Sequence, residues 1–600
     1  MSSIDFDEVL VHVGEKGRYQ NIMYYLLCIP ATLPAAFLAF SQVFVSATPD
    51  HWCRIPELEN VTSYMTLDER KALSLPYTVR SDGKRQYSRC FMYDVNYTSI
   101  IEEWLHQVNY LANDGISSAQ FPTPVSKREW PVTKCIYGWS YDKRDYDSTL
   151  VTELDLVCDN SWLPSTSTTF FYVGSLFGNV VFGWIADKWG RRTAFFAILF
   201  LEVIFSIATS FSPNYVVYTA LRTVNVLELM GPRYRTFAGM VICMFFATAM
   251  CLLALLGYLL RNWFALSLAT SVPFILLFSY WWIIPESPRW LLSKNRIDEA
   301  EVIVQQMARI NKKTVPTNFL RKIEMETLKK RGLACNGKNS SELTLEMQNI
   351  EDRPPPPSAT PMDIIKNPNI RKKFFILAFD WVANAVVYNG LSYNTTNLGV
   401  SDYLAFFIGG IVEIPSYFIT WYAMDRLGRR WVLCLTMLLA SFAVFYVFVG
   451  ELLPTVLRSQ AMGIASFIAG IGLLTFPYIV HLAVYSRVLP LIIMGSLSVA
   501  GALTSVFLPE TLNIHLPQTI EEGERFGADF KLWSCPTLPK SSTSKKRRRP
   551  SLSLRYLVNG RPGSRRRSTK ITSEAGQQNQ QEPGEKTVVT IDRAVLFRIR

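Results

Sequence analysis

Long apolar runs separated by polar segments dominate the chain between residues 24 and 511. A run of about 20 residues is long enough for a helix to cross the hydrocarbon of a bilayer. We therefore predict an all-α membrane protein, because a helix satisfies its own backbone hydrogen bonds in lipid. The spans are expected at about 24–45, 165–185, 194–211, 215–230, 237–260, 263–284, 374–393, 403–424, 431–449, 463–483 and 489–508.

A charged glycine turn recurs between apolar runs. The first copy is 183–192, with the sequence GWIADKWGRR, and an abbreviated copy is 425–430, with the sequence DRLGRR. A tight turn lets two membrane helices meet, and its cations mark the cytoplasmic face by the positive-inside rule. One copy in each half predicts two related helical bundles, 24–284 and 374–511, as in secondary transporters.

Composition narrows the class of protein further. Of the residues, 49% are apolar and 18% are charged, and the net charge is +12. The cations cluster in loops and in the C-terminal tail, as orientation signals do, so we do not expect nucleic acid as a partner. No metal site, nucleotide-binding loop or catalytic triad is recognisable, which argues against an enzyme and against a cofactor.

The polar segments complete the predicted organisation. Residues 1–23 are expected to be a cytoplasmic N-terminus, 285–373 a cytoplasmic loop between the bundles, and 512–600 a disordered, basic cytoplasmic tail. Within the loop, Ile297, Ala300, Val304 and Met307 share one stripe, so 297–311 is predicted to be an amphipathic helix at the inner membrane surface.

The polar segment 46–163 has the features of an extracellular loop. It contains four cysteines, Cys53, Cys90, Cys135 and Cys158, and glycosylation sequons at Asn60 and Asn96. An even set of cysteines together with sequons indicates an oxidising compartment, and three disulfide pairings are possible. The alternative is that the cysteines are unpaired and the sequons arose by chance. This loop could also mediate homo-oligomerisation.

The order of these motifs resembles the major facilitator superfamily, and within it the organic cation/carnitine/organic anion transporter family, in particular its insect members. The resemblance covers roughly residues 8–527 and implies twelve spans in two six-helix halves. It rests on the four-cysteine loop, 183–192, 228–235, 284–292 (IPESPRWLL), 388–393 (YNGLSY), 412–415 (VEIP), 451–458 and 508–511 (LPET).

Two distances depart from the twelve-span pattern. Only 35 residues separate Arg192 from Glu228, whereas two helices of about 20 residues and a turn need more than about 40. Only 20 residues separate Arg430 from Glu451, enough for a single crossing, which would place Glu451 and Arg458 outside. It would also place the tail outside unless a later span fails to insert. We interpret the chain as a shortened form with about ten or eleven spans; the alternative is a genuine variant with that number.

Charged residues inside spans are costly and are therefore candidate sites. Asp380 and Glu413 lie in predicted spans, and Trp381, Tyr388 and Tyr393 could offer aromatic surface to a cation. The resemblance implies that Trp381, Tyr388 and Glu413 face a central cavity. The alternatives are helix packing for the aromatics, a structural ion pair for Glu413 and an interfacial position for Asp380.

A second set of charges lies at the predicted cytoplasmic helix ends. Such residues could hold one state of a carrier and separate in the other, or they could only orient the chain. The set comprises Asp187, Arg191, Arg192, Glu228, Arg235, Asp425, Arg429, Arg430, Glu451 and Arg458.

These features predict a multi-pass plasma-membrane transporter of small organic cations or zwitterions that works by alternating access. In the resembling family, a charge in the eleventh span correlates with the charge of the substrate, but the matching position here is Gly470. A carrier of organic anions is therefore an alternative. Another is a shortened isoform that does not transport, or that inhibits a full-length relative.

Overall fold

The computed structural model describes residues 6–14, 17–23, 25–26, 29–62, 65–79, 85–113, 126, 129–225, 236–323, 325, 361–427, 429–438, 455–511 and 520–527. Within them, seven helical segments are long and apolar enough to cross a membrane. They are Cys158–Trp189, Arg191–Ser210, Ile242–Leu259, Trp263–Trp282, Pro368–Asn397, Asp402–Thr420 and Gln460–Val484, with shorter apolar helices at Thr32–Val45 and Leu489–Ser505.

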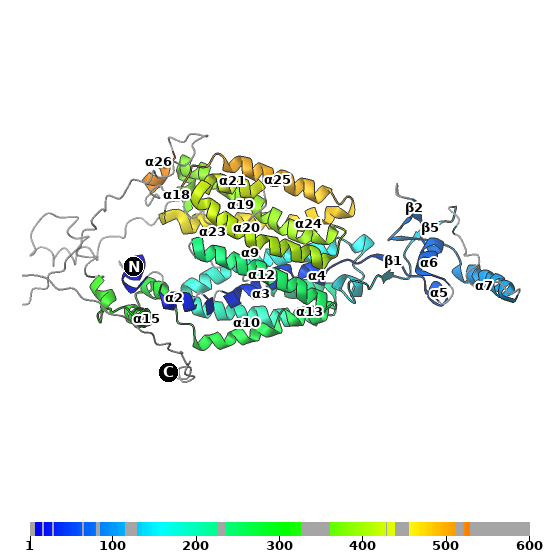
Figure 1. Cartoon of the computed structure of the whole chain (residues 1–600), viewed down its shortest axis with the longest axis horizontal. Coiled ribbons are helices and arrows are strands. Elements are labelled where there is room, and N and C mark those ends of the chain that lie inside the picture. The colour runs from blue at the N-terminus through cyan, green and yellow to red at the C-terminus, as the bar shows by residue number, and fades with distance from the viewer. Residues whose placement is uncertain are drawn as a thin grey trace, which may run out of the picture. The chain divides into compact units, whose positions relative to one another are not determined.

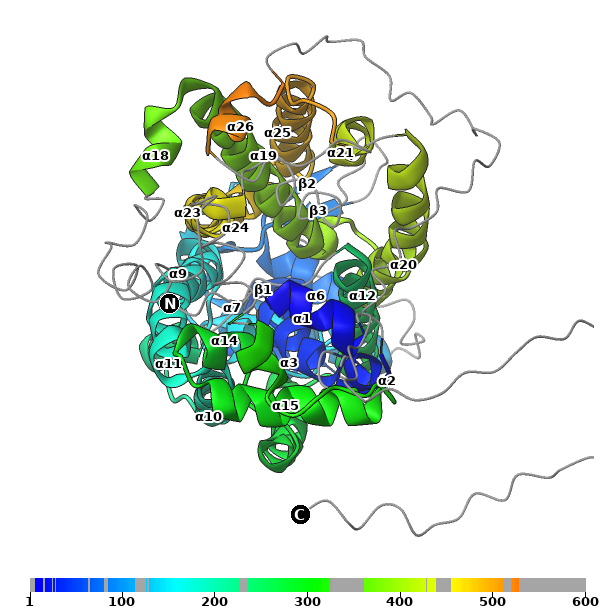
Figure 2. The same ribbon diagram turned by 90° about the vertical axis from the view of Figure 1, so that its left-hand side faces the viewer.

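Two bundles of helices lie side by side, which confirms the predicted all-α membrane fold (Figures 1 and 2). The N-terminal bundle contains α3 (Ile29–Phe40), α4 (Gln42–Val45), α9 (Leu163–Trp189), α10 (Arg191–Ser210), α11 (Tyr215–Asn225), α12 (Thr236–Leu259), α13 (Trp263–Ala269) and the 3-10 helix η4 (Val272–Trp282). The C-terminal bundle contains α19 (Pro368–Tyr393), α20 (Asp402–Leu427), α21 (Arg429–Leu438), α23 (Thr455–Leu473), α24 (Phe476–His481) and α25 (Leu489–Ser505). Short 3-10 turns, η5 (Asn394–Asn397) and η6 (Leu482–Val484), connect its helices.

The segment with the four cysteines forms a small domain at one end of the bundles, called here the disulfide domain. Its hairpins pair β1 (His51–Cys53) with β6 (Trp139–Tyr141), β2 (Tyr77–Val79) with β3 (Arg85–Tyr87), and β4 (Phe91–Tyr93) with β5 (Val132–Lys134). Its helices are α5 (Pro56–Glu59), α6 (Leu67–Ser74), α7 (Tyr97–Asn113), α8 (Leu150–Glu153) and η3 (Cys158–Asn160). Of the three possible pairings, the structure has Cys53–Cys135 and Cys90–Cys158. Asn60 and Asn96 are exposed, and their glycosylation stays a prediction.

The opposite end of the bundles carries six short helices: α1 (Phe6–Val13), α2 (Arg18–Met23), α14 (Pro288–Ser293), α15 (Ile297–Ile310), α18 (Pro361–Lys366) and α26 (Ile520–Arg525). The predicted stripe on α15 is buried, but against Val9 and Val13 of α1 and Trp290 of α14. Protein therefore covers the face that was expected to lie on the membrane. The inter-bundle residues 326–360 and the tail from 528 lie outside the described residues.

The expected shortness of the fourth span stays a prediction. Helix α11 is the described part of this span and has 11 residues. It begins at the disulfide-domain end, where the Tyr215 hydroxyl donates to the carbonyl oxygen of Leu163 at 2.9 Å. Residues 226–235 then lie outside the described part.

One expectation about the ninth span is wrong, whereas its shortness stays a prediction, because residues 439–454 lie outside the described part of the chain. The backbone N–H of Arg430, at the start of α21, donates to Glu510 at 3.2 Å, just after α25. Helix α23 contacts α18, and Leu457 near its start shares an apolar cluster with Ile364 of α18 and Leu508. Both helices thus begin at the end away from the disulfide domain (Figure 1). A single crossing between them would have put these starts at opposite ends.

The chain after α25 also returns to the end that carries α1. Glu524 of α26 accepts hydrogen bonds from the backbone N–H groups of Asn369 at 2.8 Å and Ile370 at 3.0 Å. A carboxylate at this position satisfies otherwise unpaired donors in the first turn of α19. The single-crossing expectation required residues 520–527 to lie on the disulfide-domain side, but they lie at the opposite end.

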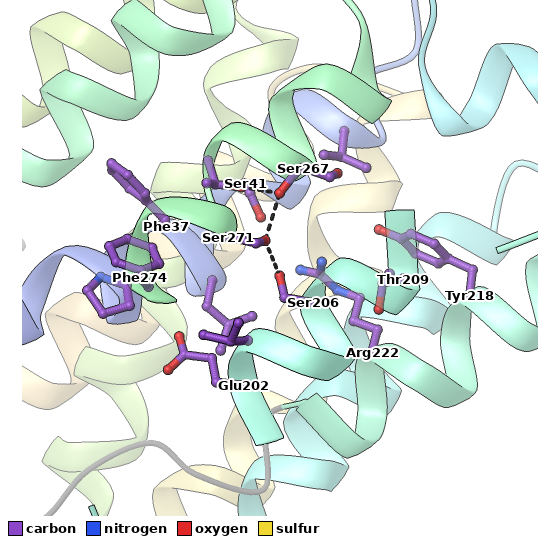
Figure 3. Close-up of a pocket in the computed structure, with 15 residues that line it drawn as sticks. Phe37, Ser41, Glu202, Ser206, Thr209, Tyr218, Arg222, Ser267, Ser271 and Phe274 are labelled. Atoms are coloured by element: carbon purple, nitrogen blue, oxygen red, sulfur yellow. Dashed lines mark hydrogen bonds between the residues drawn. The ribbon is translucent and has the colours of Figure 1, made fainter. Parts of the chain in front are cut away.

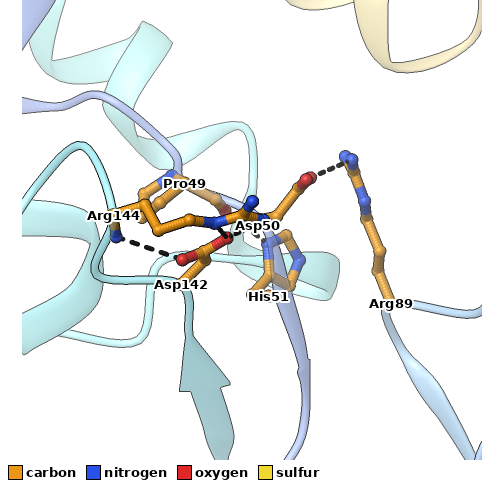
Figure 4. Close-up of polar contacts among 6 residues, drawn as sticks. All are labelled: Pro49, Asp50, His51, Arg89, Asp142 and Arg144. Atoms are coloured by element: carbon orange, nitrogen blue, oxygen red, sulfur yellow. Dashed lines mark hydrogen bonds and ion pairs between the residues drawn. The ribbon is translucent and has the colours of Figure 1, made fainter. Parts of the chain in front are cut away.

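A buried histidine should make the disulfide domain sensitive to acid. His51 is 8% exposed, and its Nδ1 lies 3.1 Å from the carbonyl oxygen of Pro49 (Figure 4). Burial lowers the pKa of His51 below its ordinary value of 6.5, and the Arg89 charge acts in the same direction, whereas the Pro49 carbonyl and Asp50 oppose it. Arg89 in turn pairs with Asp50 at 2.5 Å.

We expect the stability of this domain to fall as the pH drops below 6.5, because the unfolded chain takes up the proton before folded His51 does. The loss should be complete below the lowered pKa, and this group should have no effect well above 6.5. Hydrogen exchange of the β1 amides in the full chain, followed from pH 7.5 to 5, measures it. His51→Gln should flatten the profile and exposed His106→Gln should not; an unchanged profile in His51→Gln would contradict the assignment.

Candidate functional site

A partly buried carboxylate lies near the middle of α20, where that helix faces the N-terminal bundle. Glu413 Oε2 accepts hydrogen bonds from the hydroxyls of Tyr417 at 3.1 Å and Tyr388 at 3.4 Å. Among the described residues, no Lys, Arg or His makes an ion pair with it. The structural ion pair considered for Glu413 is therefore not seen within the described part of the chain, where two phenols hold the carboxylate.

Aromatic rings from both bundles pack around Tyr388 and Tyr393, and Tyr388 contacts this carboxylate. The Phe40 ring of α3 packs edge-on against Tyr388, with ring centroids 6.2 Å apart, and lies 6.0 Å from Tyr393. Tyr393 also packs on Phe476 at 5.2 Å, and its hydroxyl donates to the Ala39 carbonyl oxygen at 2.7 Å. Predicted residues Tyr388 and Tyr393 thus lie with Glu413 at the junction of the bundles.

Two other predicted residues lie elsewhere. Asp380 is 0% exposed and accepts hydrogen bonds from Thr504 at 2.6 Å and Ser505 at 2.9 Å. It therefore joins α19 to α25 inside the C-terminal bundle. Trp381 is 3% exposed and packs in the apolar core of the same bundle rather than in the cluster that contains Phe40 and Tyr388. These positions favour structural roles for both.

Several neighbours of Glu413 were not predicted. Tyr417 follows Glu413 by four residues, and this helical spacing could have identified it from the sequence. Phe40 and Tyr172 could not be found in this way, because they come from distant helices. The Tyr172 hydroxyl donates to Asn389 Oδ1 at 3.0 Å, across the junction of the bundles.

The position expected to select substrate charge is instead a contact between helices. A Cβ atom at Gly470 would lie 2.4 Å from Leu176 Cδ2, so the absence of a side chain lets α23 approach α9. Nearby, the Thr169 hydroxyl donates to the carbonyl oxygen of Leu474 at 3.4 Å. A side chain at this position would meet Leu176, and Gly470 itself offers no charge to a substrate.

The glycine turns at the other end use two carboxylates that the sequence analysis did not select. Glu286 accepts hydrogen bonds from the backbone N–H groups of Arg191 at 2.9 Å and Arg192 at 3.2 Å, and Glu510 accepts one from Arg430. Gly190 has φ +102°, and a Cβ there would lie 2.3 Å from Glu286 Oε2. Each carboxylate thus caps the helix that follows a glycine turn.

Three described members of the predicted charge set contact tryptophans close to their own helix ends. The Arg192 guanidinium lies over the Trp281 ring at 4.6 Å, and the Asp187 carbonyl accepts from Trp290 Nε1 at 3.1 Å. Arg430 is buried over the Trp431 ring at 4.9 Å. Glu228, Arg235 and Glu451 lie outside the described residues, as do the side chains of Asp425, Arg429 and Arg458.

Contacts between the bundles occur around this junction and at the disulfide-domain end. The Tyr146 hydroxyl donates to Asp402 at 2.9 Å, and the Tyr403 hydroxyl donates to the Asp145 carbonyl oxygen at 3.0 Å. Phe44 stacks on Tyr403 with ring centroids 5.3 Å apart. The disulfide domain thereby joins the N-terminal bundle to the first turn of α20.

Comparison with known proteins agrees with this architecture. The family model for sugar (and other) transporters matches residues 130–240 and 237–450. A carcinine transporter of Drosophila melanogaster is 34% identical over 579 residues, covering 89% of this chain and 81% of that protein. A beta-alanine transporter of the same organism is 35% identical over 576 residues, with 89% and 91% covered, and an organic cation transporter protein is 37% identical over 567 residues, with 87% and 95% covered.

The fold and these matches define a multi-pass membrane transporter rather than an enzyme. The chain belongs to the sugar (and other) transporter family and, within it, to the organic cation transporters. The resemblance inferred from the motifs is thereby confirmed, and a form that does not transport is not favoured.

Proposed function

We propose that this protein carries small organic cations or zwitterions across the plasma membrane by alternating access, and that Glu413 receives the substrate's ammonium group. The observation that supports this most is a carboxylate at the junction that accepts hydrogen bonds from Tyr388 and Tyr417 and has no ion pair among the described residues. A cation entering beside it would gain an ion pair and the faces of nearby aromatic rings. The names of the relatives, which include organic cations, carcinine and beta-alanine, agree with such substrates.

The direction of transport follows from the same arrangement. The disulfide domain would face the exterior, and the glycine turns and α15 would face the cytoplasm. The two bundles would then rock about the junction at Glu413, opening each end in turn. The contacts of Asp145, Tyr146 and Phe44 with α20 would close the outer side in the state described here.

Uptake measurements test this proposal. Cells expressing this chain should accumulate labelled tetraethylammonium or β-alanine saturably, and an organic anion such as p-aminohippurate much less. Cells carrying the empty vector set the background, and biotinylation of surface protein normalises the amount of transporter. Saturable uptake of the anion alone would favour the organic-anion alternative, and surface-exposed protein without uptake of any of the three would refute the proposal.

The glycine turn offers a separate test of gating. We expect Asp187→Asn to lower the rate of transport several-fold while changing the binding of a labelled cation less than about twofold, because a helix-end charge alters the equilibrium between states rather than the substrate site. Comparing initial uptake rates with equilibrium binding in membranes measures both. Asp298→Asn, an exposed change on α15, is the control. Equal losses of binding and transport would contradict a gating role.

A further inference from the structure

A small polar pocket lies inside the N-terminal bundle, between α3, α10, α11, α13 and η4 (Figure 3). The lining is rich in hydroxyl groups, and it also contains Glu202 and Arg222. A chain of hydrogen bonds runs from Ser206 to Ser271 at 2.5 Å and from Ser271 to the Ser267 carbonyl oxygen at 2.7 Å. The cavity volume accessible to water is about 30 Å³, which is enough for about two water molecules or one small functional group.

The guanidinium of Arg222 is the unusual group in this pocket. Arg222 is 5% exposed, and its Nε and Nη2 atoms have no hydrogen-bond partner within the described part of the chain. Glu202 lines the same pocket, but no ion pair joins the two residues. Buried donors of this kind are costly unless an acceptor meets them, because their hydration is lost.

The position of Arg222 is set by a close approach of two helices. A Cβ atom at Gly174 of α9 would lie 2.0 Å from the Thr223 carbonyl oxygen of α11. This approach puts the Arg222 guanidinium over the Phe171 ring, 4.7 Å from its centroid. The same guanidinium lies beside the hydroxyls of Tyr218 and Tyr393.

Tyr393 connects this pocket to the Glu413 site. Its ring contacts Phe40, which also packs against Tyr388, and Tyr388 donates to Glu413. A positive group and a negative group, neither paired with a side chain of opposite charge in the described chain, are therefore connected through contacts of Tyr393, Phe40 and Tyr388. The Nε and Nη2 atoms of an arginine form the fork that binds a carboxylate through two parallel hydrogen bonds.

We propose that Arg222 binds the carboxylate of a zwitterionic substrate whose ammonium group lies at Glu413. The pocket accommodates the carboxylate alone, and the rest of the substrate lies along the layer formed by Phe40, Tyr388 and Tyr393. This inference rests on the proposed function at Glu413 and adds a preference for amino acids over simple amines.

The test compares β-alanine with β-alaninamide, which keeps the ammonium group and replaces the carboxylate by a neutral amide. Unmodified protein should take up β-alanine with a KM at least about tenfold lower than that for the amide, since a charge-assisted pair is lost with the amide. Arg222→Gln should reduce this preference to less than about threefold while uptake of β-alaninamide persists. Arg309→Gln, an exposed change on α15, should leave the preference unchanged.

The outcomes separate the two proposals. If the unmodified protein takes up neither compound, the carboxylate site is overturned; if it also fails to take up tetraethylammonium, the Glu413 proposal is contradicted as well. Uptake of both with equal KM leaves that proposal standing and overturns the carboxylate site, whether or not the variant folds. A preference for β-alanine that persists in Arg222→Gln also overturns the carboxylate site. The site is likewise overturned if replacing chloride by gluconate changes the uptake of the unmodified protein in the same way as Arg222→Gln does, because the pocket would then hold a free anion. If Arg222→Gln fails to reach the surface, Arg222→Lys, which keeps the charge without the fork, should show a reduced preference; an undiminished preference there overturns the site.

Discussion

Glu413→Gln is expected to lower the kcat/KM for uptake of a labelled organic cation by about thirtyfold or more, with little change in the amount of transporter at the surface. The substitution keeps the shape of the side chain and a carbonyl oxygen for the hydroxyls of Tyr388 and Tyr417. It removes the negative charge, and a charge-assisted contact contributes about 1.5–3 kcal/mol. Packing is therefore preserved while the attraction for an ammonium group is lost.

Initial uptake rates at several substrate concentrations, normalised to surface protein, measure this effect. Glu102→Gln makes the same chemical change on exposed helix α7 and should transport normally. Normal uptake by Glu413→Gln would show that the cation binds elsewhere. The variant also separates the two ends of a zwitterion: it should weaken uptake of β-alanine and β-alaninamide alike, whereas Arg222→Gln should affect only the former.

Gly174→Ala is expected to cause the largest loss of folded protein from a single methyl group. The new Cβ would lie 2.0 Å from the Thr223 carbonyl oxygen, and backbone atoms cannot move aside as a flexible side chain can. Overpacking of this kind costs about 1–3 kcal/mol. Helices α9 and α11 would have to separate, which would also move Arg222 away from the Phe171 ring.

The melting temperature of detergent-purified protein, with surface abundance in cells, tests this expectation. Gly183→Ala is a matched control because it lies on the same helix, where a Cβ would meet no atom within 4 Å. We expect the melting temperature of Gly174→Ala to fall by several degrees and that of Gly183→Ala to stay within about a degree of the unmodified protein. Equal melting temperatures for the two variants would mean that α9 and α11 are further apart than described.

Much of the fold follows from local sequence. The apolar runs predict the long helices because their length must match the bilayer, and the repeated glycine turns predict two related bundles. The spacing also predicts short fourth and ninth spans, and this stays a prediction because both α11 and α21 end where the described part of the chain is interrupted. Glu413, Tyr388 and Tyr393 are accessible to sequence reasoning because charges and aromatics stand out inside apolar helices.

What the sequence could not determine depends on contacts between distant segments. Only the folded chain shows which cysteines pair. The same holds for the burial of Asp380 against Thr504 and Ser505 and for the position of the start of α23, at the end that carries α1. The predicted single crossing between the second glycine turn and α23 is wrong because the length of an apolar run does not determine at which end of the bundle the next helix begins. Arg222 is identifiable from sequence as a charge within a span, but only the packing of α11 on α9 placed it, buried, at a polar pocket beside Tyr393. Burial and hydrogen-bond partners depend on neighbours in space, which the sequence does not specify.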